Sequence, residues 1–151
     1  MHQAEFLEGV LKLAAQEAQA SGYAQITPAH LLISLARFTE ADSPADASVA
    51  GALREAFASA GMEPRTFRRA LRSLLGNRGE KPPDGVMHRS ARCKAVFAVA
   101  GQLAAQAGIP VDGRHLFYAA LYTLSVDEFA AAEPHTPKAA AEGADEIPHE
   151  L

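Results

Sequence analysis

Two stretches of the chain share one pattern of apolar, small and capping residues. Residues 10–36 and 95–121 align without a gap when the sequence is shifted by 85 positions. The identical positions are Ala15/Ala100, Ala20/Ala105, His30/His115 and Leu31/Leu116. Two helices joined by a turn cannot bury their apolar faces alone, so we expect the two copies to pack on each other. The repeat therefore predicts a helical module with a groove between its halves, rather than a catalytic pocket.

Each copy predicts an Ala-rich helix, a tight turn and a second helix with a capping residue. Thr27 precedes Pro28, and proline is favoured at the first position of a helix because its missing N–H needs no partner there. We expect the rings of His30 and His115 to bond neighbouring backbone groups in the first turns of the second helices; a catalytic or pH-sensing role is the alternative. The structural markers of the repeat are Thr27, His30, Leu31, Asp112, His115 and Leu116.

Apolar periodicity predicts a helix from about Glu5 to Ala20 and further helices along the chain. The later ones begin at Pro28, Val49, Pro64, Ala91 and after Asp112, with a short seventh helix from Ser125. The predicted inward side chains are Leu31, Leu32 and Leu35 in the second helix and Phe67, Leu71, Leu74 and Leu75 in the fourth.

These elements predict one all-α domain over residues 1–132, made of two pseudo-symmetric repeats. The first repeat spans about 5–76, a Pro/Gly-rich linker covers 77–89, and the second repeat spans about 90–132. We expect the second repeat to be either truncated at its end or covered there by a partner, because residues 126–132 are too few for its last helix pair. Residues 133–151 contain few large apolar side chains, so we expect a flexible tail.

The bulk composition fits one globular domain. The chain has 151 residues, of which 48% are hydrophobic, and it has no apolar run of the roughly 20 residues that a membrane span needs. The N-terminus does not have the pattern of a signal peptide. Cys93 is the single cysteine, which excludes an internal disulfide and fits a reducing compartment, so we expect a cytoplasmic protein. We interpret Cys93 as an inert thiol, although neighbouring cations would favour a reactive one.

Basic residues concentrate between positions 65 and 94. This segment contains nine Lys and Arg residues and only two acidic residues, whereas the whole chain has a net charge of −4. Arg65, Arg68, Arg69 and Arg72 have the spacing of one stripe on the fourth helix. The stripe is either a solvated face or a docking surface for an acidic protein partner. Nucleic-acid binding by segment 65–94 is the alternative function, and the overall pI of 5.8 argues against it.

No residue pattern predicts catalysis, a cofactor or a metal site. The histidines lack metal-ligand spacing, and the sequence has no Gly-rich phosphate loop and no Gly-x-Ser-x-Gly elbow. We therefore expect a protein that is not an enzyme. A small hydrolase or transferase is the third alternative, with no positive support in the sequence.

The twofold occurrence of this helix–turn–helix pattern resembles the N-terminal domain of Clp ATPases, the ring-shaped protein unfoldases. The residues that carry the resemblance are Leu11, Ala14, Ala18, Gly22, Thr27, His30, Leu31 and Leu32. Segment 60–75 is similar to the corner between the family's third and fourth helices, and segment 90–108 to the opening of its second repeat. The resemblance covers about residues 5–130.

The resemblance implies an all-α interaction domain that receives adaptor proteins or unfolding substrates and passes them to an ATPase ring. This chain is then either the excised head of a larger enzyme or a free-standing homologue. Some family members bind phosphorylated arginine through acidic residues just before the repeat histidines. Ala29 and Arg114 hold those positions here, and the missing carboxylates argue against phosphoarginine binding. The candidate partner-binding residues are Ala29, Ser90, Arg114, Arg65, Arg68, Arg69 and Arg72.

Overall fold

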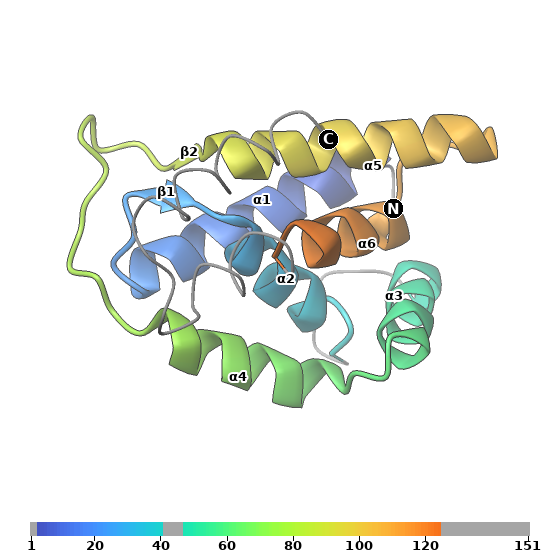
Figure 1. Cartoon of the computed structure of the whole chain (residues 1–151), viewed down its shortest axis with the longest axis horizontal. Helices are drawn as coiled ribbons and strands as arrows, with labels where there is room; N and C mark the ends of the chain where they lie inside the picture. The colour runs from blue at the N-terminus through green and yellow to red at the C-terminus, as the bar shows by residue number, and fades with distance from the viewer. Residues whose placement is uncertain (1–2, 41–46, 125–151) are drawn as a thin grey trace, which may run out of the picture.

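The computed structural model describes residues 3–40 and 47–124, and these form six helices and two short strands (Figure 1). The helices are α1 (Gln3–Ala20), α2 (Pro28–Arg37), α3 (Ala47–Ser59), α4 (Pro64–Leu75), α5 (Ala91–Ala107) and α6 (Gly113–Thr123). The strands are β1 (Gln25–Ile26) and β2 (His88–Arg89). The predicted all-α class is confirmed. The predicted seventh helix, the end of the second repeat and the tail lie outside the described residues.

Helix α2 lies at the centre of the fold. Nine consecutive residues, 28–36, are buried, and α1, α4, α5 and α6 all contact this helix (Figure 1). The predicted inward face of Leu31, Leu32 and Leu35 is therefore too narrow. The whole helix is buried because neighbours surround it, and the absence of any charged residue between 28 and 36 is the sequence signal for this.

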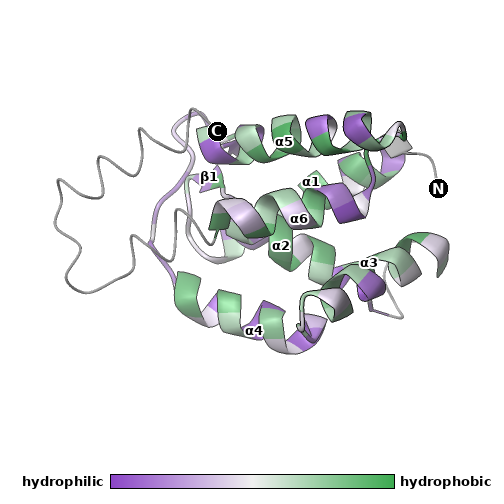
Figure 2. Cartoon of the chain, turned by 45° about the vertical axis from the view of Figure 1, so that its right-hand side comes forward, coloured by the Kyte–Doolittle hydropathy of each residue, from purple (hydrophilic) through white to green (hydrophobic). Residues whose placement is uncertain are grey.

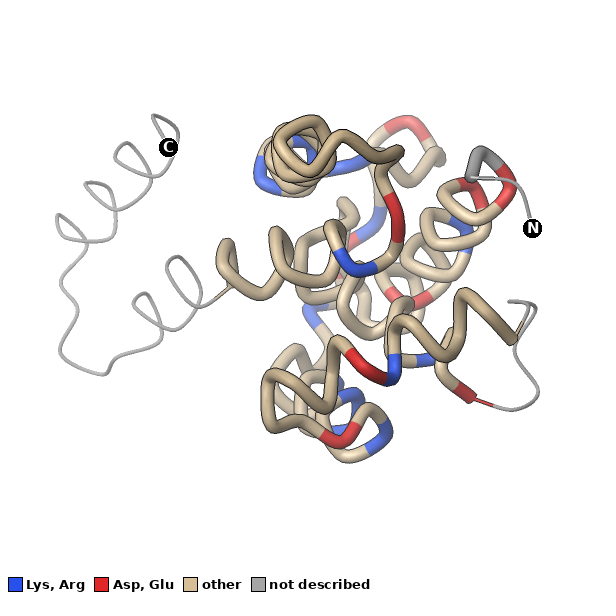
Figure 3. The backbone as a smooth tube through the Cα atoms, turned by 90° about the vertical axis from the view of Figure 1, so that its right-hand side faces the viewer, with Lys and Arg blue, Asp and Glu red and all other residues tan. Residues whose placement is uncertain are grey.

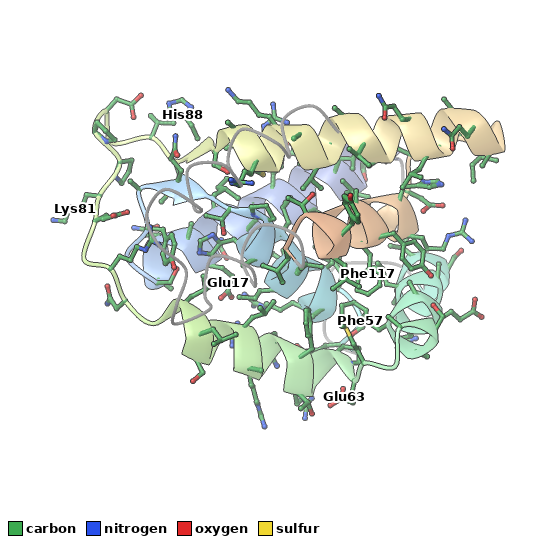
Figure 4. The ribbon with its side chains drawn as sticks, in the orientation of Figure 1. Glu17, Phe57, Glu63, Lys81, His88 and Phe117 are labelled. Carbon is green, nitrogen blue, oxygen red and sulfur yellow. The ribbon has the colours of Figure 1, made fainter. Side chains whose placement is uncertain are left out.

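The two halves of the chain meet where α3 and α2 pack against α6. The rings of Phe57 in α3 and Phe117 in α6 lie with their centroids 4.4 Å apart (Figure 4). Gly113 is the first residue of α6, and its backbone lies close to side chains of the first half. A Cβ atom at this position would lie 2.9 Å from Leu53 and 3.0 Å from Phe6. The expected packing of one half on the other is therefore present, with a glycine where the backbone of α6 comes nearest to α1 and α3.

The repeat has one residue fewer in its second copy. In α1 the amides of Gly22 and Tyr23 donate to the carbonyls of Gln19 and Ala18. The matching bonds at the end of α5 lie 86 positions later, between Gly108 and Ala105 and between Ile109 and Ala104. Helices α2 and α6, in contrast, begin 85 positions apart. The gap-free alignment is therefore wrong for the first helix of each copy, because the turn after α5 is one residue shorter.

The longer turn in the first copy contains β1, which pairs in parallel with β2. This ladder cannot be predicted from the sequence pattern, since two-residue strands have no periodicity. The segment before β2 is also attached to the turn. The amides of Arg78 and Glu80 donate to the carbonyls of Ser21 and Gly22 at 3.1 and 2.7 Å. These bonds fix the connection between the halves beside the C-terminal end of α1 (Figure 1).

The repeat histidines have the same structural role in both copies. The N–H of Thr27 donates to Nδ1 of His30 at 3.0 Å, and the N–H of Asp112 donates to Nδ1 of His115 at 2.9 Å. These bonds satisfy backbone donors at the starts of α2 and α6, as the sequence analysis expected. Because Nδ1 of His30 accepts, its Nε2 carries the proton and donates to the Ser21 hydroxyl at 2.9 Å.

Burial of His30 predicts that the protein loses stability in mild acid. Desolvation lowers the pKa of His30 from 6.5 to about 4, so below pH 6.5 the unfolded chain binds a proton that the folded chain does not. We expect the free energy of unfolding to fall by up to about 3 kcal/mol between those values. Urea denaturation across this pH range measures how the free energy of unfolding changes with pH. The variant His30→Gln should remove this pH dependence. A control variant, His88→Gln, whose ring is exposed, should keep the pH dependence; an unchanged pH dependence in His30→Gln would contradict this role.

Candidate protein-binding surface

A groove of about 360 Å³ lies between the two halves of the fold. Phe6 and the N-terminal half of α3 line it from the first half, and the turn before α6 together with the start of α6 lines it from the second half. Its apolar lining residues are Phe6, Val49, Ala52, Leu53, Ile109, Pro110 and Val111. Ile109 is one of the exposed large apolar residues of the described part. The structure therefore contains a groove between the halves, as the repeat predicted.

An ion pair closes one end of this groove. A guanidinium nitrogen of Arg114 lies 2.8 Å from Oδ2 of Asp112, and Oδ1 of the same carboxylate accepts from the Arg114 amide at 2.9 Å. Burial alone would raise the pKa of Asp112, but the hydrogen bonds and charge of Arg114 and the charge of His115 outweigh it and lower the pKa. The rim thus carries a fixed pair of opposite charges beside an apolar floor, an arrangement that suits a polypeptide with both apolar and polar groups.

A line of aromatic side chains continues from the groove along α6. Arg114, Tyr118 and Tyr122 follow one another at intervals of four residues, so they share one face of the helix. Tyr118 and Tyr122 are 43% and 51% exposed, and the Tyr118 hydroxyl lies 2.9 Å from the hydroxyl of Ser59. The sequence analysis missed this face, although the spacing of the two tyrosines would have indicated it.

The arginine stripe of α4 faces partly inward. Arg72 binds both carboxylate oxygens of Glu17 at 2.9 and 2.6 Å, and Arg37 binds the same carboxylate at 3.1 Å. Arg68 binds Glu40 at 2.5 Å and is largely buried. Arg65 also lies 3.9 Å from the Glu40 carboxylate, so three of the four predicted docking residues are engaged in ion pairs within the protein. They connect α4 to α1 and to the end of α2.

These ion pairs set the rotation of α4. Hydrophobic and hydrophilic residues alternate along this helix (Figure 2), and its arginines border the face that contacts α2. Leu71 is buried and Leu75 is half-buried, whereas Leu74 is 74% exposed. The prediction that Leu74 points inward is wrong, because pairing of Arg68 and Arg72 with Glu40 and Glu17 turns the helix away from it. Arg65 and Arg69 remain on the exposed side.

The basic segment 65–94 does not form one patch. Four of its cations lie on α4 and two at the start of α5, and these helices are on opposite sides of the molecule (Figures 1 and 3). The other three, Arg78, Lys81 and Arg89, lie along the connection between the two helices. Arg78 stacks over the ring of Tyr23 and Arg89 over the ring of Phe97, at 4.4 and 5.1 Å from the centroids. This division, together with the ion pairs of α4, disfavours the nucleic-acid alternative, which needs a continuous basic surface.

The remaining candidate residues have structural roles. Ala29 is 2% exposed, so as a partner-binding residue it is a wrong prediction; its place in α2 buries it. The Ser90 hydroxyl caps α5 by accepting from the Cys93 amide at 3.1 Å. Cys93 is buried, and desolvation raises its pKa to about 12, which agrees with an inert thiol.

The family model for the Clp repeat N-terminal domain matches residues 4–125. The chain belongs to the Clp repeat N-terminal domain family. The match includes both copies of the repeat, the groove between them and the face of α6. No curated protein matches this Clp N-terminal domain in sequence comparison.

Two features are absent from the described part of this Clp N-terminal domain. No group of three or more His, Cys, Asp or Glu residues there is placed to hold a metal ion. Within the same residues, no helix is both long enough and apolar enough to cross a membrane.

Removal of the Glu17 carboxylate tests the ion pairs of this Clp N-terminal domain. Burial favours the protonated acid, but hydrogen bonds and charges from Arg72 and Arg37 outweigh it and lower the pKa of Glu17 below 4.5. We expect Glu17→Gln to destabilise the domain by about 2 kcal/mol at pH 7, since two partly buried cations lose their partner. The difference from wild type should shrink as the pH falls below 4.5 and Glu17 protonates. Urea denaturation measures this difference in the free energy of unfolding. The control variant is Glu8→Gln, on the exposed side of α1.

Proposed function

We propose that the chain is a non-catalytic module that recruits adaptor proteins or unfolding substrates to a Clp-type ATPase. Family membership supports this role, and the single structural observation that carries it is the groove between the halves. Its apolar floor lies beside the Arg114–Asp112 ion pair, so it offers both hydrophobic contact and hydrogen bonding to an extended polypeptide. We place this role in the cytoplasm, where the buried Cys93 stays reduced.

The geometry supports binding better than catalysis. The charged groups at the groove, Asp112 and Arg114, bind each other, and Nδ1 of His115 accepts a hydrogen bond from the Asp112 amide. Ser48 is the other polar side chain among the lining residues. A catalytic site needs an acid, a base or a nucleophile with a free reactive atom facing the substrate. The groups at the groove instead hold the start of α6 in place, so the groove is suited to contact rather than to chemistry.

Binding of an unfolded protein tests the proposal directly. Fluorescein-labelled casein serves as the probe, and its anisotropy measures saturable binding to the full chain. We expect Ile109→Asp to weaken the affinity by about tenfold, because a charge at the apolar lining must be desolvated when a polypeptide binds. The matched control is Val86→Asp, which changes an exposed valine in the connection before β2.

Two results would contradict the proposed role of the groove. One is the absence of saturable casein binding by the wild-type chain. The other is equal binding by wild type and Ile109→Asp when circular dichroism shows that the variant is folded.

A further inference from the structure

The outer face of α4 is open to solvent within the described part of the chain. This helix packs mainly on α2 and lies at the lower edge of the molecule in Figure 1. Leu74, on the outer face, is 74% exposed, which is the largest exposed fraction among the large apolar side chains of the described residues. The exposed residues of the helix are Arg65, Thr66, Arg69, Ala70, Ser73 and Leu74.

Two lines of side chains run along α4, and each has the spacing of one helix face. The basic line consists of Arg65, Arg69 and Arg72, and the apolar line consists of Phe67, Ala70 and Leu74. Thr66 and Ser73 lie between the two lines, and their side chains are small, so a second helix can come close to α4 there. The outer face therefore has a cationic edge and an apolar edge.

The arginines around α4 outnumber the carboxylates that neutralise them. Two carboxylates each serve two guanidinium groups: Glu17 pairs with Arg37 and Arg72, and Glu40 pairs with Arg65 and Arg68. Nε of Arg68 is buried without a hydrogen-bond partner. Arg69 has no carboxylate within ion-pair distance among the described residues. With Glu63 at the start of α4 included, five arginines and three glutamates leave a surplus of two positive charges.

We propose that the outer face of α4 binds an acidic amphipathic helix of a protein partner. Carboxylates spaced one turn apart on the partner pair with Arg69 and its neighbours on the cationic edge, and an apolar side chain of the partner covers Leu74. Burial of Leu74 supplies affinity, and the surplus positive charge selects acidic partners and speeds their association. The proposal goes beyond the proposed role of the groove and does not depend on it, since no residue of α4 lines the groove.

The apolar edge favours a protein partner over a nucleic acid. Phosphate groups bind cations but leave an aliphatic side chain such as Leu74 in water. A nucleic-acid surface also needs a continuous basic area, whereas Phe67, Ala70 and Leu74 take up one edge of this face. An amphipathic helix with acidic residues along one side satisfies both edges at once.

A labelled peptide tests the proposal with the full chain. The probe is a fluorescein-labelled helical peptide of about 15 residues, with glutamates along one side and leucines along the other, and anisotropy measures its affinity. We expect Arg69→Glu and Leu74→Ser each to weaken binding by about tenfold, because one loses an ion pair and the other an apolar contact. Lys94→Glu, which reverses an exposed cation on α5, is the matched control and should leave the affinity unchanged.

The location of the binding site is read from the wild-type chain, so it does not depend on how well a variant folds. Backbone amide resonances of residues 65–74 should shift when the peptide is added, and those of residues 109–114 in the groove should not. Ile109→Asp should likewise leave peptide binding intact, even though it is expected to weaken casein binding. A failure of the groove proposal and a failure of this one are therefore distinguishable.

Several results would overturn the proposal. One is the absence of saturable peptide binding, and another is equal binding of a peptide in which glutamine replaces every glutamate. Equal weakening by Lys94→Glu would show that only the net charge of the chain matters. Tight binding of a labelled DNA duplex that is lost in Arg69→Glu but kept in Leu74→Ser would identify nucleic acid as the occupant. Self-association that Arg69→Glu removes would identify a second copy of the chain.

Discussion

Burial of α2 on every side is the constraint on which the other helices depend. Helices α1, α4, α5 and α6 each have to present an apolar face to it. Each fully buried Leu or Ile contributes roughly 1.5–3 kcal/mol, so this one helix supplies a large share of the stability. Its polar side chains are bonded internally: the Ser34 hydroxyl donates to the Val10 carbonyl at 2.8 Å, and both ring nitrogens of His30 have partners.

The same arrangement determines which surfaces remain for binding. The second half contributes α6 both to the core and to the outside, so one side of this helix holds Leu116 and Phe117 and the other presents Tyr118 and Tyr122. The groove begins at Gly113, where the halves come closest. Because both surfaces are built on helices fixed by the core, a partner meets a preformed shape and little ordering is needed on binding.

Much of the fold and part of the site can be predicted from local sequence. Thr27-Pro28, Ser90 and Asp112 each mark a helix start correctly, because capping depends on a few adjacent residues. The shorter second turn, the β1–β2 ladder and the rotation of α4 could not be predicted, since they arise from contacts between distant segments. The four-residue spacing of Tyr118 and Tyr122 indicates that they share one face of α6, but their exposure of 43% and 51% depends on how this helix packs in the fold.

Native-state hydrogen exchange in increasing urea tests most directly whether α2 unites the two halves. If α2 is the shared core, amides in the middle of α2 and of α6 become exposed only on global unfolding. Their opening free energies should then equal each other and equal the value from urea denaturation followed by circular dichroism. Opening of α5 and α6 at a clearly lower free energy, with α2 still protected, would show that the second half unfolds alone and would contradict this account.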